Sequence, residues 1–187
     1  MTKAKPSPKR KRGSSTSATA KRKRPQRQSP KAAPNWDPNL VVFACNWCSY
    51  AGADTAGVSR IQHQPHFRMI RVMCSGRVQP GFVLRAFEKG ADGVLVSGCH
   101  FGDCHYIFGN ERAVEQFDKT MNMVKLLGLE EGRLRLEWIS AAEGGRFAEV
   151  INEFTDQVRA LGPSPLKQGP QPSAASPAPR MRAASSG

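Results

Sequence analysis

Short apolar runs alternate with amphipathic stretches through the middle of this chain, and this alternation restricts the possible fold more than any other feature. The run at 40–44 is apolar throughout, as expected of a strand covered on both faces of a sheet. Further runs follow at 68–73, 94–96 and 133–138, and each run precedes a stretch with helical character. Strands that alternate with helices imply a parallel sheet with right-handed crossovers. The sequence therefore predicts an α/β domain with a small parallel four-stranded sheet in a flavodoxin-like, three-layer arrangement.

Several residues mark the ends of these elements. Pro80 opens the second helical stretch and Gly90 ends it. The clearest helix is stopped by Gly162 and Pro163, and its apolar stripe consists of Phe147, Val150, Ile151, Phe154, Val158 and Leu161. In the last run, Leu134, Leu136 and Trp138 alternate with the polar residues Arg133, Arg135 and Glu137. This alternation predicts a half-exposed strand at the edge of the sheet.

Charge and composition divide the chain into three parts. Residues 1–34 contain 12 Lys or Arg and no acidic residue, in a chain whose formal net charge is +13. Both ends are rich in Pro, Ser, Ala and Gln, and such segments bury too little apolar surface to offset the entropy of ordering. We therefore expect disordered tails at 1–36 and 163–187 and one folded domain at 37–162.

The sequence contains neither a candidate membrane span nor a recognisable secretory signal. No run approaches the roughly 18 apolar residues of a membrane span. The N-terminus has no apolar core of a secretory signal, which predicts a cytoplasmic protein without membrane contact. The basic runs 9–12 (KRKR) and 21–24 (KRKR) predict weak contact with nucleic acid or an acidic partner. A solvated extension without function is the alternative.

All five cysteines follow predicted strands, in three groups. Cys45 and Cys48 come after the first strand, Cys74 after the second, and Cys99 and Cys104 after the third. Because open α/β sheets bind ligands outside the carboxyl ends of their strands, we expect three loops to bring these sulfurs to one metal centre. Thiolates suit both iron–sulfur clusters and zinc, and a [2Fe–2S] cluster needs four of them, which leaves one cysteine spare. Buried structural thiols and a thioredoxin-like dithiol are weaker alternatives.

Three further residues lie within the cysteine groups. His100 and His105 flank the third group, and we expect them to donate hydrogen bonds around the ligands, with direct ligation as the alternative. Arg77 follows Cys74 and is expected either to offset the charge of a cluster or to contact a partner, with a surface ion pair as the alternative. The glycines between 98 and 109 match no nucleotide-binding fingerprint.

Several segments together resemble the delta subunit of methyl-viologen-reducing hydrogenase, which also occurs with heterodisulfide reductase. They are 44–50 (ACNWCSY), 73–78 (MCSGRV), 90–94 (GADGV), 98–106 (GCHFGDCHY), 109–110 (GN) and 138–144 (WISAAEG). The resemblance covers nearly all of 38–160. It implies one [2Fe–2S] cluster, with the five cysteines as candidate ligands, in an electron-transfer subunit that performs no bond chemistry alone.

The resemblance also implies partners. Such a subunit links a [NiFe]-hydrogenase to a heterodisulfide-reductase-type flavoprotein. The basic N-terminal extension departs from the family pattern, and a different dehydrogenase module would supply the electrons in a host without that hydrogenase. A zinc-stabilised interaction module without a redox role is the alternative function.

Overall fold

The computed structural model describes residues 36–167, and in this part of the chain the predicted alternation of strands and helices is confirmed. The strands are β1 (Leu40–Cys45), β2 (Phe67–Val72), β3 (Gly93–Gly98) and β4 (Leu134–Trp138). The helices are α1 (Ser49–Val58), α2 (Pro80–Glu88), α3 (Gly109–Leu126) and α4 (Gly144–Leu161). Short 3-10 turns are η1 (Ser75–Arg77), η2 (Glu131–Arg133) and η3 (Pro165–Lys167).

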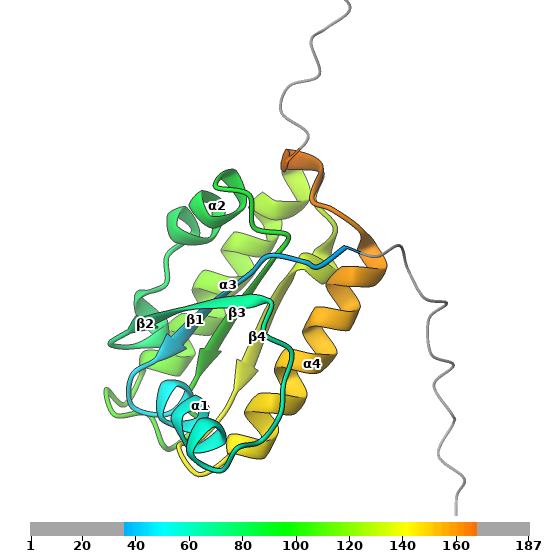
Figure 1. The fold of residues 1–187 in the computed structure, drawn as a ribbon. Helices are drawn as coiled ribbons and strands as arrows, with labels where there is room; N and C mark the ends of the chain where they lie inside the picture. Colours follow the sequence, from blue (N-terminus) through cyan, green and yellow to red (C-terminus); the bar gives the residue numbers. More distant parts are fainter. Residues whose placement is uncertain (1–35, 168–187) are drawn as a thin grey trace, which may run out of the picture. The chain divides into compact units, whose positions relative to one another are not determined.

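The strands form one parallel sheet in the order β2-β1-β3-β4, as Figure 1 shows. Leu40 pairs with Phe67 on one side and with Gly93 on the other, while Val94 pairs with Leu134. All residues of β3 and nearly all of β1 are buried, whereas β2 is half-exposed at one edge. The predicted flavodoxin-like sheet, with the fourth strand at the other edge, is therefore confirmed. Because all four strands are parallel, their carboxyl ends meet at one edge of the sheet.

Helices cover both faces of the sheet and complete the predicted three layers (Figure 1). On one face, α1 and α4 pack against the sheet through a core that includes Leu95, Ile151 and Phe154. On the other face, α2 and α3 pack through a core that includes Phe87 and Val124. Burial of two such apolar layers stabilises the fold and fixes where each strand ends.

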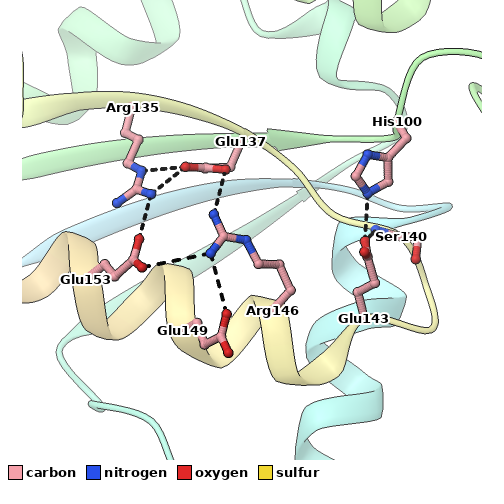
Figure 2. Close-up of polar contacts among 8 residues, drawn as sticks. All are labelled: His100, Arg135, Glu137, Ser140, Glu143, Arg146, Glu149 and Glu153. Atoms are coloured by element: carbon pink, nitrogen blue, oxygen red, sulfur yellow. Dashed lines mark hydrogen bonds and ion pairs between the residues drawn. The ribbon is translucent and has the colours of Figure 1, made fainter. Parts of the chain in front are cut away.

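A network of ion pairs joins the polar face of β4 to α4 (Figure 2). The guanidinium of Arg135 lies 2.5 Å from Glu137 and 2.9 Å from Glu153 on α4. Arg146 on α4 lies 3.4 Å from Glu137 and 3.5 Å from Glu149. The alternating polar residues of the edge strand thus face a charged stripe of α4 rather than open water.

Arg133 departs from the alternation that predicted it on an exposed face, because its side chain is fully buried. Its guanidinium donates hydrogen bonds to the carbonyl oxygens of Asp92, Gly162 and Pro163 at 2.9 to 3.2 Å, and it pairs with Glu130. Donors directed at fixed acceptors offset the cost of removing this charge from water. Two of these acceptors, the carbonyl oxygens of Gly162 and Pro163, belong to the segment that follows α4. The alternation of a strand carries no information about them.

The described structure continues beyond the predicted domain boundary at 162. Ser164 is buried, and its N–H donates to Asp92 at 2.9 Å, while Nζ of Lys167 lies 2.5 Å from the same carboxylate. Residues 163–167 therefore pack on the domain. Of the tails predicted at 1–36 and 163–187, residues 1–35 and 168–187 lie outside the described residues. Across 36–167, none of the helices is long and apolar enough to cross a membrane.

Candidate metal centre

The structure brings all five cysteines to the carboxyl edge of the sheet. Cys45 is the last residue of β1, Cys48 precedes α1, and Cys74 lies between β2 and η1. Cys99 directly follows β3, and Cys104 lies in the loop that leads to α3. Four of these side chains are buried, Cys104 is half-buried, and none forms a disulfide. Three loops that are far apart in the sequence thus supply one group of free thiols.

Cys45, Cys48 and Cys99 form the more buried part of this group, with Cys104 packed against them. The sulfur atoms of Cys45 and Cys99 are 3.7 Å apart. Two thiolates that share one tetrahedral metal at bond lengths near 2.3 Å are separated by about 3.8 Å. The separation of Cys45 and Cys99 therefore fits two ligands of one iron or zinc ion.

Cys74 and Cys104 meet at the first residue of α3. A Cβ atom on Gly109 would collide with the sulfur of Cys74 and would lie 2.9 Å from the sulfur of Cys104. Only a residue without a side chain lets both sulfurs lie against the start of this helix. The backbone of Gly109 thus lies in close contact with two of the five thiols.

The thiols differ in their affinity for protons. The pKa of Cys45 is lowered to about 6, first because Cys99 donates a hydrogen bond to its sulfur, and further because backbone N–H groups of Trp47, Cys48 and Ser75 do so. The pKa of Cys99 is raised, chiefly by that same hydrogen bond to Cys45, and burial raises the pKa of Cys48 and Cys74. Cys45 is thus a readier thiolate ligand than Cys48, Cys74 and Cys99, and metal binding to those three must release protons.

The donors fit a thiolate-bound metal, although their side chains do not surround a single point. Within residues 36–167, no three His, Cys, Asp or Glu side chains are placed around one ion position. The sulfurs instead lie in two neighbouring groups, one of Cys45, Cys48 and Cys99 and one of Cys74 and Cys104 against Gly109, and Cys104 also packs on the first group. Soft sulfur donors of this kind suit iron–sulfur clusters and zinc.

The three residues predicted around the ligands have different surroundings. Nε2 of His100 lies 2.7 Å from Oε2 of Glu143 (Figure 2). The ring of His105 stacks on Trp47 with the ring centroids 3.8 Å apart. Arg77 is exposed and lines a cavity beside Cys74. His100 and His105 are therefore engaged by neighbours other than the thiols, while Arg77 faces the surface.

Glu143 and Asn110 hold the loop of Cys99, and sequence reasoning did not select either as a site residue. Glu143 accepts a hydrogen bond from the N–H of Ser140 at 2.7 Å, and this bond, followed by that from His100, lowers the pKa of Glu143 to about 2. The buried Asn110 amide donates to the carbonyl oxygen of His100 at 2.9 Å. A carboxylate just after the fourth strand, at the same sheet edge as the cysteines, is the signal that could have found Glu143.

Fold and site together define a small parallel α/β domain with a cluster of cysteine thiols at the carboxyl edge of its sheet. The family model described as methyl-viologen-reducing hydrogenase, delta subunit, matches residues 40–162. The chain belongs to this family.

Curated relatives agree with the family assignment. The chain is 52% identical over 136 residues, 73% of its own length and 94% of the relative's, to the vhc iron-sulfur subunit of the F420-non-reducing hydrogenase of Methanococcus voltae. It is 52% identical over 128 residues, 68% of its length and 93% of the relative's, to the iron-sulfur subunit of the F420-non-reducing hydrogenase of Archaeoglobus profundus. It is also 52% identical over 126 residues to one subunit of the ferredoxin:CoB-CoM heterodisulfide reductase of Methanosarcina mazei, covering 67% of this chain but only 16% of that protein.

Proposed function

We propose that this protein binds one [2Fe–2S] cluster through four of the five cysteines, Cys45, Cys48, Cys74, Cys99 and Cys104, and relays single electrons. Its electrons come from a hydrogenase or another dehydrogenase module and pass to a heterodisulfide-reductase-type flavoprotein. The protein makes and breaks no substrate bond itself.

The observation that carries this proposal is the arrangement of the sulfurs in two neighbouring groups at one sheet edge. A [2Fe–2S] cluster takes four thiolates, two on each iron. The 3.7 Å separation of the Cys45 and Cys99 sulfurs suits two ligands of one iron, and Cys74 and Cys104, which meet at Gly109, would bind the other. A single zinc ion would need three or four of these sulfurs around one point.

Relatives support iron over zinc. The similar proteins of Methanococcus voltae and Archaeoglobus profundus are named iron-sulfur subunits. An iron–sulfur cluster supplies one-electron chemistry when it is bound. The chain itself would hold the cluster through buried thiols and keep water away through the packing around Cys45 and Cys99, each of which is almost fully buried.

The partner assignment rests on the same comparisons. The matching region of the Methanosarcina mazei protein is part of a longer heterodisulfide reductase chain, so there the related segment is joined covalently to a reductase component. Transfer to a separate flavoprotein of that type is the corresponding arrangement for this chain. We place the relay in the cytoplasm, where cysteine thiols remain reduced and available to a cluster.

Metal analysis of protein purified without oxygen tests the proposal. We expect a brown protein with about two iron and two sulfide per chain. A colourless protein with about one zinc per chain would replace the relay with a zinc-stabilised module.

A further inference from the structure

A cavity of about 430 Å³ opens at the carboxyl edge of the sheet beside Cys74. One wall runs from Met73 to Arg77 through η1, and the other runs from Tyr106 to Arg112 through the first turn of α3. The walls contact each other directly, because a Cβ atom on Gly76 would lie only 2.5 Å from the carbonyl oxygen of Gly109 and 3.2 Å from Cβ of Arg112. This contact holds the two walls together, and the cavity volume lies in the range of sites that bind a small ligand.

Two guanidinium groups at this cavity have no counterion among residues 36–167. Arg77 and Arg112 are exposed, and within residues 36–167 neither guanidinium forms a hydrogen bond, an ion pair or a ring contact. Several other arginines of the domain are paired with carboxylates, namely Arg85, Arg133, Arg135, Arg146 and Arg159, whereas Arg68 bonds Asn39 and Arg71 lies over the ring of Tyr50. Unpaired arginines that face one cavity provide forked donors suited to a carboxylate.

Apolar side chains surround these charges. Met73, Tyr106 and Phe108 line the cavity with 56%, 47% and 59% of their surfaces exposed. Tyr106 also packs edge-on against Trp47, which continues the aromatic surface toward the β1 loop. Met, Tyr, Phe and Arg are the residue types enriched at the centres of protein–protein interfaces, where a few anchors carry most of the affinity.

We propose that this cavity receives an acidic segment of the protein that exchanges electrons with this domain. A carboxylate of that segment lies between Arg77 and Arg112, and its apolar neighbours pack on Met73, Tyr106 and Phe108. The choice of an electron partner rests on the proposed function, because Cys74, a candidate ligand, forms part of the cavity wall. An occupant here therefore lies beside the metal centre.

Charge argues against a second copy of this chain as the occupant. A symmetric dimer through this face would place the same patch on both protomers. The unpaired Arg77 and Arg112 of one copy would then face those of the other, and like charges across an interface are unfavourable. An acidic partner removes this repulsion and supplies both missing counterions.

Calorimetry with the full chain, loaded with iron and sulfide without oxygen, tests the docking site. The probe is the flavin-loaded heterodisulfide-reductase-type flavoprotein of the same organism. The variants are R112E and R77E/R112E. The control K89E/K119E changes the net charge by as much as R77E/R112E does, at exposed lysines outside the cavity, and Lys119 lies on α3 itself. We expect Kd to rise about 10-fold for R112E and about 100-fold for R77E/R112E, with the control within about twofold of the wild type.

Each alternative gives a distinct result. Absence of binding by the wild type, unchanged binding by R77E/R112E, or an equal loss in K89E/K119E overturns the docking site. Self-association of the wild-type chain that R112E abolishes, measured by sedimentation, assigns the cavity to a second copy and also overturns it. Iron and sulfide are measured for every variant. If R77E/R112E differs from the wild type in metal content, the test rests on the comparison of R112E with the wild type. For the redox readout the chain is first reduced with dithionite and freed of the excess reductant. A reduced wild-type chain that binds the probe but transfers no electrons to its flavin contradicts the relay and leaves the docking site standing.

Discussion

His100 and Glu143 join the loop of Cys99 to the loop that follows β4, with 2.7 Å between the imidazole Nε2 and the carboxylate Oε2 (Figure 2). The carboxylate oxygen that meets the imidazole also accepts the N–H of Ser140, so one oxygen connects two loops at the carboxyl edge. The pKa of Glu143, about 2, keeps this carboxylate charged at neutral pH. This contact positions His100, the residue next to Cys99, without involving a thiol.

Replacement of Glu143 tests this positioning role. Glu143→Ala removes the acceptor of both His100 and Ser140, so we expect the loop from Cys99 to Cys104 to open more often and to release iron to a chelator several-fold faster. The matched control is Glu149→Ala, which removes an exposed α4 carboxylate whose partner, Arg146, is 3.5 Å away. Release rates that are equal in wild type and Glu143→Ala would show that the pair does not restrain the loop.

Gly109→Ala tests the contact between α3 and the thiols. The added Cβ would collide with the sulfur of Cys74 and crowd that of Cys104, so we expect a folded chain with most of its bound iron and visible absorption lost. Gly145→Ala is the control, because a Cβ at that helical position meets no atom within 4 Å. A Gly109→Ala protein with wild-type iron and sulfide would contradict the placement of these two sulfurs.

Single Cys→Ser variants at the five cysteines test the ligand set. A [2Fe–2S] cluster with four thiolate ligands leaves one cysteine without a bond to iron. We therefore expect four variants to lose most of their visible absorption and the fifth to keep it, each measured after anaerobic reconstitution. Equal tolerance of all five substitutions would contradict a thiolate-bound cluster at this site.

Glu130 gives the domain a pH-dependent contribution to stability. The hydrogen bond from Arg133 lowers the pKa of Glu130 below its ordinary 4.5. Since the folded-state pKa is the lower one, this stabilisation is complete above the unfolded-state pKa and is lost as pH falls through the folded-state value. Because Glu130 is about half exposed, solvent screening limits the effect to less than about 1 kcal/mol.

Urea unfolding of wild type and Glu130→Gln measures this contribution. We expect the difference in unfolding free energy between the two proteins to be larger at pH 7 than near pH 3. Both proteins lose acid-labile metal near pH 3, so this loss does not contribute to the difference. Glu131→Gln, which removes an exposed carboxylate 3.0 Å from Lys125, is the control for general surface charge. The same difference at both pH values would exclude a lowered pKa for Glu130.

Much of the fold follows from periodicity in the sequence. The buried strands β1 and β3 are continuous apolar runs, and the stripe from Phe147 to Leu161 defines α4, so element type and order are predictable. The start of α3 at Gly109 was not predicted, because its first turn consists of a glycine followed by polar residues, and the apolar stripe begins only at Val114. Contacts with the thiols, rather than periodicity, define that turn.

The candidate site was predictable only in part. Parallel strands place their carboxyl ends at one edge, so the meeting of Cys45, Cys74 and Cys99 follows from topology alone. The His100–Glu143 pair depends on how two loops 43 residues apart approach each other, and the burial of Arg133 depends on carbonyl groups 28 to 30 residues later in the chain. Neither relationship leaves a periodic signal.

A potentiometric titration followed by electron paramagnetic resonance tests the central claim, that this chain relays single electrons through a cysteine-bound cluster. We expect the anaerobically purified protein to undergo a one-electron transition near −400 mV, as is typical of [2Fe–2S] centres with four cysteine ligands. A midpoint above about −150 mV, in the range of histidine-ligated centres, would contradict a low-potential relay from a hydrogenase, and the absence of any paramagnetic signal on reduction would contradict the cluster itself.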